Sequence, residues 1–161
     1  EDHPEGYYLE FYRGRLLLDL GRGSEALPHL RRSLSLAPRE EDIPYIYSYI
    51  GSAQRQMGQY REAVDSYRQG LVHDERRPDI HNGLGVCYFK LGDHLRAVDH
   101  FQRAVELNPS SAIDYANLAL NQEKIGRLDE AMANYQIALS QDPTIEFAIQ
   151  GLAGLMALKE R

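Results

Sequence analysis

Four glycines at nearly constant spacing constrain the fold of this 161-residue chain more than any other feature. Gly58, Gly92 and Gly126 lie 34 residues apart, and Gly21 precedes Gly58 by 37 residues. Apolar residues at helical spacing flank each glycine, which is typical of a tight turn between two helices. The sequence therefore predicts an all-α chain of about four helix–turn–helix units.

Further residues recur in the same register. Three units share an alanine and, four positions later, an aromatic residue: Ala63 with Tyr67, Ala97 with Phe101, and Ala131 with Tyr135. The unit from Pro78 to Ser111 is the most complete copy, with Leu84-Gly85, Tyr88, Leu91-Gly92 and Leu107-Asn108-Pro109 at fixed offsets. A register shared by several units is hard to attribute to chance.

This pattern resembles the tetratricopeptide repeat across residues 7–145. The resemblance implies a right-handed α-solenoid that forms a single array over residues 1–161. We expect repeats at about residues 7–40, 44–77, 78–111 and 112–145, followed by a terminal helix over residues 146–161. Residues 39–43, which carry the one insertion, are expected to form a longer turn.

Both ends of the sequence suggest a longer array. Pro4 lies 34 residues before Pro38, so the chain is expected to begin in the tail of a preceding repeat, although an accidental proline explains Pro4 equally well. The terminal helix keeps Phe147, Leu155 and Leu158, so either it packs on another element or the natural chain continues.

Several helix boundaries can be predicted from capping residues. We expect a helix over about residues 25–37 with Ser24 as its N-cap and Pro28 near the end of its first turn. Ser111 with Asp114 forms an approximate capping box before the fourth repeat.

Composition narrows the classes of function. The net charge is −6, which argues against nucleic-acid binding, and no apolar run approaches the roughly 20 residues that span a membrane. A single cysteine, Cys87, excludes an internal disulfide framework, so we expect a cytoplasmic protein. Cys87 itself is expected to be a small buried hydrophobic residue.

Charge is graded along the array. Lys and Arg minus Asp and Glu gives +2 for residues 7–40, +1 for 44–77, −1 for 78–111 and −3 for 112–145. A positive leading end and a negative trailing end allow copies to associate head to tail, a structural role that is the first alternative to a binding function.

The sequence offers no catalytic machinery. It lacks the phosphate-binding loop, the Gly-x-Ser-x-Gly elbow, the His-Glu-x-x-His helix and the Cys-x-x-Cys pair, and its six histidines form no i,i+4 pair. We therefore expect no catalytic residue, no cofactor and no metal. A further alternative is that the array is the substrate-docking arm of a larger enzyme.

The resemblance also implies a concave groove, lined by the first helix of each repeat, that binds a peptide or helix of a partner protein. The candidate groove residues are Tyr8, Phe11, Tyr12, Arg15, Tyr45, Tyr49, Ser52, Arg55, Asn82, Phe89 and Asn117. Tyrosines crowd the first two of these helices.

Helix geometry divides these tyrosines into two groups, because successive helical residues diverge by about 100°. We expect Tyr7 and Tyr47 to be structural, and Tyr8, Tyr12, Tyr45 and Tyr49 to line the groove. With Arg15 and Arg55 beside them, these rings favour a partner segment with apolar and acidic side chains. Alternatively, the tyrosines pack on one another or cover a missing upstream repeat.

One subclass of the family can be tested by its own residues. Chaperone-binding members hold two carboxylates with Lys, Asn and Arg side chains, and the matching positions here are Phe11, Arg15, Tyr49, Asp79 and Gly83. Arg15 alone has a suitable side chain, so recognition of a chaperone's acidic C-terminus is disfavoured.

Overall fold

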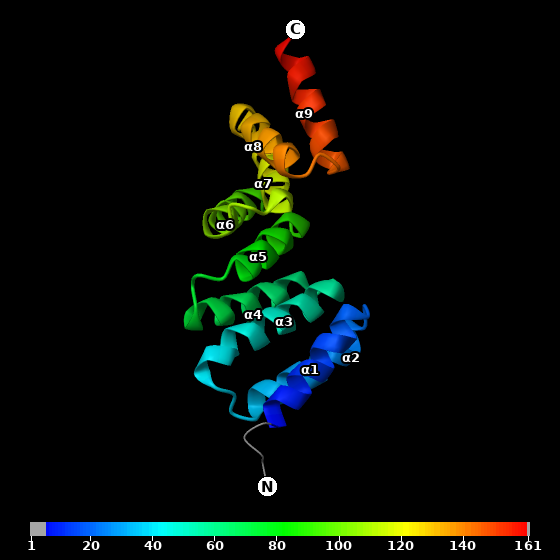
Figure 1. Ribbon diagram of the computed structural model, residues 1–161, viewed down its shortest axis with the longest axis vertical. Helices are drawn as coiled ribbons and strands as arrows, with labels where there is room; N and C mark the ends of the chain where they lie inside the picture. The colour runs from blue at the N-terminus through cyan, green and yellow to red at the C-terminus, as the bar shows by residue number, and fades with distance from the viewer. Residues whose placement is uncertain (1–5, 161) are drawn as a thin grey trace. The chain divides into compact units, whose positions relative to one another are not determined.

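A computed structural model describes residues 6–160, which form nine α-helices and one 3₁₀-helix and contain no β-strand (Figure 1). The elements are α1 Gly6–Asp19, α2 Gly23–Ser35, η1 Glu40–Asp42, α3 Ile43–Gln56, α4 Tyr60–His73, α5 Pro78–Lys90, α6 His94–Leu107, α7 Ala112–Lys124, α8 Leu128–Gln141 and α9 Glu146–Lys159. The prediction of an all-α fold of paired helices is confirmed. Pro4, on which we based the expectation of a preceding repeat, lies outside the described residues.

The four register glycines occupy the tight turns predicted for them. Their φ angles are +75° at Gly21, +74° at Gly58, +78° at Gly92 and +80° at Gly126, in the left-handed region that side chains with a Cβ avoid. At Gly92, the Gly92 amide donates to the Phe89 carbonyl (3.0 Å) and the Asp93 amide to the Tyr88 carbonyl (2.9 Å). This pair of hydrogen bonds, the Schellman motif, recurs at all four glycines and satisfies the last carbonyls of each preceding helix.

The same turn starts the next helix two residues after each glycine, which corrects one prediction. The second helix begins at Gly23 with Arg22 in the N-cap position, so Ser24 is not the N-cap. Pro28 consequently lies in the second turn and not in the first. Ser111 does precede α7 as its N-cap, but its side chain makes no capping hydrogen bond, so the predicted capping box does not form.

The recurring anchors are core residues. Ala63, Ala97, Ala131 and Tyr135 have no exposed surface, and Tyr67 and Phe101 are 1% exposed. Tyr67 reaches from α4 toward glycines on α3 and α5, where a Cβ at Gly83 would lie 2.4 Å from its ring. Small residues opposite each large ring therefore allow the helices to pack closely.

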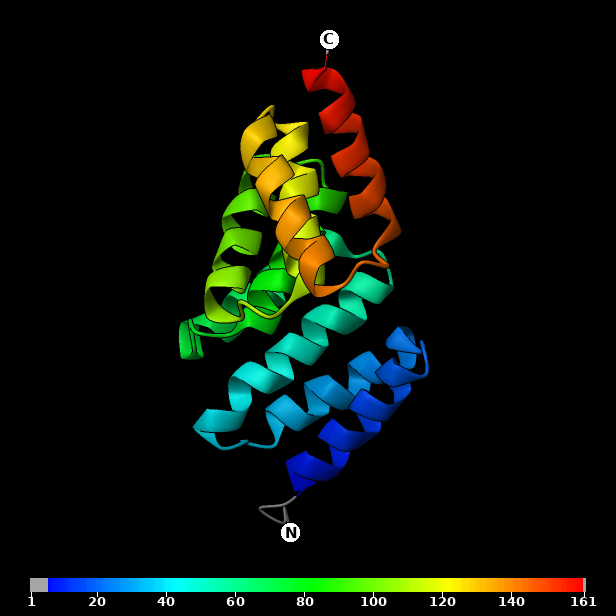
Figure 2. The same cartoon turned by 45° about the horizontal axis from the view of Figure 1, so that its top comes forward.

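The chain divides into two compact units, one ending at Cys87 and the other beginning at Tyr88. In the first unit, α1 packs on α2 and both contact α3, which packs on α4 (Figure 2). Its core includes Tyr7, Leu30 and Ile46. In the second unit, α7 contacts α6, α8 and α9 around Ala119, Tyr135 and Ala148.

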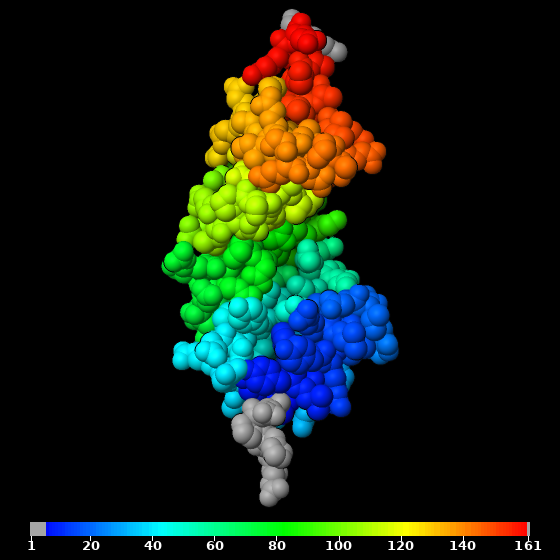
Figure 3. Space-filling view, viewed as in Figure 1, coloured from blue at the N-terminus to red at the C-terminus, as the bar shows by residue number. Residues whose placement is uncertain are grey.

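The terminal helix α9 belongs to the second unit, where it buries Ala148 and Leu155. Its second half also carries exposed apolar side chains, Met156 and Leu158. Figure 3 shows this half of α9 (red) projecting beyond α8.

Candidate functional site

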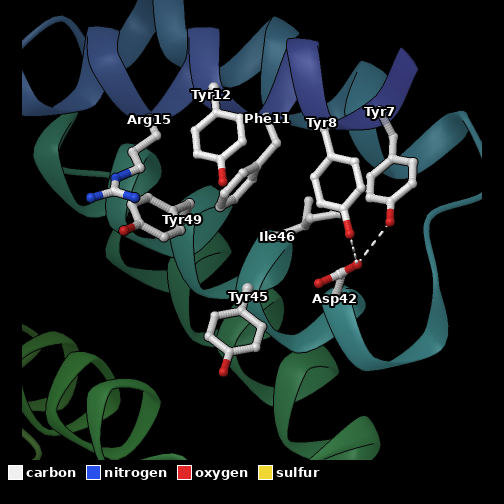
Figure 4. A pocket seen from close by; sticks show the side chains of 9 residues that line it. All are labelled: Tyr7, Tyr8, Phe11, Tyr12, Arg15, Asp42, Tyr45, Ile46 and Tyr49. Carbon is white, nitrogen blue, oxygen red and sulfur yellow. Dashed lines mark hydrogen bonds between the residues drawn. The ribbon is translucent and has the colours of Figure 1, made fainter. Parts of the chain in front are cut away.

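A cavity of about 310 Å³, hereafter the aromatic pocket, opens in the first unit between α1 and α3 (Figure 4). Its lining residues are Tyr7, Tyr8, Phe11, Tyr12, Arg15, Asp42, Tyr45, Ile46 and Tyr49. Those from α1 other than Tyr7 follow the spacing i, i+3, i+4, i+7, which places them on one face of the helix. Helices α1 and α3 therefore supply eight of the nine lining residues, and Asp42 of η1 supplies the ninth.

Three rings form the centre of the pocket. The Phe11 ring meets Tyr49 edge to face, with 5.2 Å between centroids and 89° between planes, and meets Tyr12 at 5.6 Å and 67°. Edge-to-face contacts of this kind fix ring orientation. Tyr12 and Tyr45 nevertheless remain 57% and 51% exposed, so large apolar surfaces face solvent beside a preformed cavity.

A carboxylate closes one end of the pocket. Asp42, the last residue of η1, accepts hydrogen bonds at Oδ2 from the hydroxyls of Tyr7 (2.8 Å) and Tyr8 (3.0 Å) and from Nε of Arg39 (3.2 Å). The Tyr7 and Tyr8 rings stack with 4.2 Å between their centroids. These contacts hold η1 against the start of α1.

The Arg15 side chain lies at the end of the pocket opposite Asp42 (Figure 4). Arg15 has a half-exposed side chain, and its Nε lies 3.9 Å from Asp19 Oδ2. A surface ion pair this long contributes little to stability. Arg15 is therefore available to an acidic group that enters the pocket.

Residues around the start of α5 form a second network against α3. The Arg77 guanidinium lies 3.8 Å from the Tyr45 ring centroid and donates from Nε (2.9 Å) and Nη2 (2.8 Å) to Asp79, which also accepts from the Ser48 hydroxyl (2.7 Å). Burial opposes ionisation of Asp79, but the hydrogen bonds from Arg77 and Ser48 outweigh it and hold the pKa of this carboxyl below its usual range. The network fixes Tyr45 at the pocket mouth.

The structure brings six of the eleven predicted groove residues together in the aromatic pocket: Tyr8, Phe11, Tyr12, Arg15, Tyr45 and Tyr49. Ser52, Arg55 and Asn82 lie in the same unit but do not line the pocket, and the Ser52 hydroxyl lies 3.0 Å from that of Tyr67. Phe89 and Asn117 belong to the second unit. A binding role for all eleven stays a prediction.

Sequence reasoning missed three lining residues. Tyr7 is buried, as expected of a structural residue, but its hydroxyl still reaches the pocket edge. Ile46 is 1% exposed and contributes from the core side. Asp42 lay in the segment expected to be a plain turn, and no signal in the sequence showed that this segment forms a 3₁₀-helix against α1.

The single cysteine of the sequence, Cys87, is a potential nucleophile. Cys87 is fully buried, and burial raises the pKa of its thiol to about 11, which disfavours the nucleophilic thiolate. Within residues 6–160, no three His, Cys, Asp or Glu side chains are grouped so as to hold a metal ion. Over the same residues, every helix is too short or too polar to cross a bilayer.

Comparison with known sequences identifies related proteins. Two patterns described as tetratricopeptide repeat match the chain, over residues 50–112 and 115–145. Photosystem I assembly protein Ycf3 of Prochlorococcus marinus is 31% identical over 60% of this chain and 57% of its own length. Anaphase-promoting complex subunit 3 of Schizosaccharomyces pombe is 29% identical over 74% of this chain and 17% of its own length. A protein O-mannosyl-transferase of Caenorhabditis elegans is 29% identical over 62% of this chain and 14% of its own length. The chain thus spans less than two thirds of each relative.

Solved structures share the fold. MamA superposes with a TM-score of 0.84 at 22% identity, covering 98% of this chain and 85% of MamA. YrrB, described as a TPR protein with an unusual peptide-binding site, gives 0.81 at 24% identity, with coverages of 99% and 79%. The first TPR of Spaghetti (RPAP3), solved with an HSP90 peptide, gives 0.71 at 23% identity, with coverages of 74% and 95%. The helix pairs are therefore those of a repeat solenoid.

Proposed function

Because the chain belongs to the tetratricopeptide repeat family, we propose that it is a protein-interaction module that binds a peptide or helical segment of a partner at the aromatic pocket. The observation that carries this proposal is the row of partly exposed rings around a preformed cavity. Large exposed aromatic surfaces are uncommon without a partner and are enriched at binding hot spots. A cavity of about 310 Å³ lies within the usual range of ligand pockets.

The rigid setting of the pocket supports binding of an apolar anchor. Phe11 and Tyr49 are held by edge-to-face contacts and Tyr45 by Arg77, so little side-chain entropy remains to be lost on binding. Tyr12 and Tyr45 also have hydroxyl groups that can bond to a peptide backbone.

The chaperone-type ligand of the RPAP3 complex is a poor match for this chain. Of the positions that hold two carboxylates in that subclass, Asp79 is an anion paired with Arg77, and Gly83 has no room for a side chain against Tyr67. Phe11 and Tyr49 carry no positive charge. The partner class proposed here is therefore anchored by apolar contacts and not by a terminal carboxylate.

The match to tetratricopeptide repeats supports a non-catalytic role for this chain. The resemblance to a short part of an O-mannosyl-transferase suggests a second setting for the same function. In a longer enzyme, the array would dock a substrate protein while another domain performs the reaction.

Replacing Tyr12 and Tyr49 together by Ala tests the proposal. We expect the affinity for a partner segment to fall well over tenfold, since two ring surfaces of the pocket are lost. The matched control is Tyr60→Ala with Val72→Ala, which removes an aromatic and an aliphatic side chain from α4 outside the pocket. Equal affinity of the two double variants, with unchanged circular dichroism, would show that the pocket is not the site.

Self-association is a second candidate, favoured by exposed apolar side chains at both ends of the chain. Leu9 and Leu16 are exposed on α1, Leu20 is exposed in the turn that follows it, and Met156 and Leu158 are exposed on α9. Contact between the N-terminal end of one copy and the C-terminal end of another would cover these exposed apolar side chains. It would also bring the positively charged first repeat of one copy against the negatively charged last repeat of the other. Light scattering should then show oligomers that dissociate as salt rises; a monomer at every protein concentration contradicts this candidate.

A further inference from the structure

The aromatic pocket carries opposite charges at its two ends. Figure 4 shows Arg15 at one end of the row of rings and Asp42 at the other. The sequence pattern predicted the arginine end, but the acidic end comes from the inter-repeat segment that folds as η1. A ligand therefore meets a cation, an apolar floor and an anion in succession.

The anionic end continues into a second hollow, hereafter the acidic cleft. It shares Asp42 and Tyr45 with the aromatic pocket, and its other lining residues are Glu40, Glu41, Pro44, His73 and Asp74. Four carboxylates thus face a cavity of about 550 Å³. Arg39 offsets part of this charge, since it pairs with Glu41 (3.3 Å) and Asp42 (3.2 Å).

The contacts of Asp42 leave it able to receive a cation. All three of its donors bind Oδ2, and Oδ1 points away from the tyrosine hydroxyls in Figure 4. Arg77, which stacks on Tyr45 of the same pocket, is paired with Asp79. The potential at this end of the pocket is therefore negative.

Resting on the proposed function, we infer that the bound segment is itself bipolar: an apolar anchor with a basic residue on the Asp42 side and an acidic residue on the Arg15 side. The spacing of the two charges follows from α1. Tyr8, which contacts Asp42, precedes Arg15 by seven residues, or roughly 10 Å of helix at 1.5 Å per residue. An extended peptide covers that length in about three residues and a helical one in about seven.

The occupant of the aromatic pocket is a segment of a partner protein and not an end of this chain. Charge complementarity is the reason, because a uniformly acidic or uniformly basic segment meets repulsion at one end of the pocket. Opposite ends also fix the direction in which a segment lies.

The test uses synthetic peptides and charge-neutralised variants. The probes are acetylated, amidated decapeptides with a central Phe and with Lys, Glu or Gln at each flanking position, measured by fluorescence anisotropy. We expect the tightest peptides to carry Lys on one side of the anchor and Glu on the other. Exchanging that Lys for Gln should weaken binding at least fivefold to the wild type but less than twofold to Asp42→Asn.

Exchanging the Glu of the peptide for Gln should likewise weaken binding at least fivefold to the wild type but less than twofold to Arg15→Gln. Asp65→Asn and Arg68→Gln, which neutralise exposed side chains on α4, serve as matched controls and should behave as wild type. If Asp42→Asn lowers the melting temperature through loss of its tyrosine bonds, the double variant Glu40→Gln/Glu41→Gln weakens the same end without touching them.

Three outcomes would overturn the inference, and they are distinguishable. If peptides with neutral or only acidic flanks bind as tightly, and binding still depends on Tyr12 and Tyr49, the bipolar ligand is wrong while the proposed function stands. If no peptide binding depends on these tyrosines, the proposed function fails as well. If Asp42→Asn abolishes self-association in light scattering, the occupant is a second copy.

Discussion

At the scale of single residues, the backbone conformation at the helix junctions determines which residues are favoured there. The four turn glycines have φ angles between +74° and +80°, and Ala37, one residue beyond the C-cap of α2, has φ +51°. An L-residue with a Cβ is strained in this region by roughly 1–2 kcal/mol. Ala37 therefore occupies a position that glycine favours.

A pair of opposite substitutions tests this reading. Gly92→Ala should lower the free energy of unfolding by about 1 kcal/mol, since nothing lies within 4 Å of the new Cβ and only the φ angle opposes it. Ala37→Gly should change it by no more than about 0.5 kcal/mol in the stabilising direction, because relief of strain is offset by the flexibility of glycine in the unfolded chain. Urea titrations measure both; a stabilising Gly92→Ala would contradict the account.

The Asp79 carboxyl gives a pH dependence whose sign follows from its lowered pKa. Because the folded-state pKa lies below the unfolded value of about 4, the ionised form favours folding. Its contribution is present above about pH 4 and is lost as pH falls through the folded-state pKa. Asp79→Asn should therefore be less stable than wild type at pH 7, and the difference should shrink toward pH 3.

Thermal melts at pH 7, 5 and 3 measure this difference. Asp65→Asn is the control, since this exposed α4 carboxyl lies outside the Arg77 network. A difference between wild type and Asp79→Asn that stays constant down to pH 3 would show that the Arg77–Asp79 pair does not act through its charge.

At the scale of helices, close packing depends on small residues facing large rings. A Cβ at Gly83 of α5 would lie 2.4 Å from the Tyr67 ring of α4, and one at Gly51 of α3 would lie 2.7 Å from it. Tyr67 is held by the Ser52 hydroxyl, and burial raises its pKa to about 12. The ring cannot move away without breaking this contact.

Two glycine-to-alanine changes with opposite signs follow from this packing. Gly83→Ala should destabilise the protein by about 1–3 kcal/mol through overpacking against Tyr67. Gly154→Ala, in α9 with nothing within 4 Å, should stabilise it by about 0.5–1 kcal/mol through helix propensity. Chemical denaturation compares them, and equal effects would mean that helix propensity and not packing governs both sites.

The sequence predicts features that depend on local periodic patterns better than features that depend on how the connecting segments fold. The turn glycines and the anchors such as Ala97 and Phe101 follow from a short periodic pattern. The six predicted residues that line the pocket came instead from the resemblance to the tetratricopeptide family. The prediction that Ser24 is an N-cap was wrong, because the Schellman turn starts the helix two residues after Gly21. Asp42 and the Arg77–Asp79 pair depend on where connecting segments fold, which no periodicity records.

At the scale of the whole molecule, the repeat anchors specify the fold, whereas the proposed function rests on the surface of the first helices. The tetratricopeptide family and its solenoid fold are therefore evident from buried anchor residues. Under the proposed function, the choice of partner depends on the residues of the aromatic pocket. This chain spans only part of each relative compared. The central claim is thus that a partner segment binds between α1 and α3.

Mapping of backbone amide chemical shifts tests that claim most directly. On titration of the ¹⁵N-labelled protein with the tightest decapeptide, we predict saturable shifts concentrated in α1, η1 and α3, around Tyr8, Tyr12, Asp42 and Tyr49. The Tyr12→Ala/Tyr49→Ala variant should lose these shifts while keeping a dispersed spectrum. Shifts that instead cluster in α7, α8 and α9, and that persist in this variant, would contradict the account.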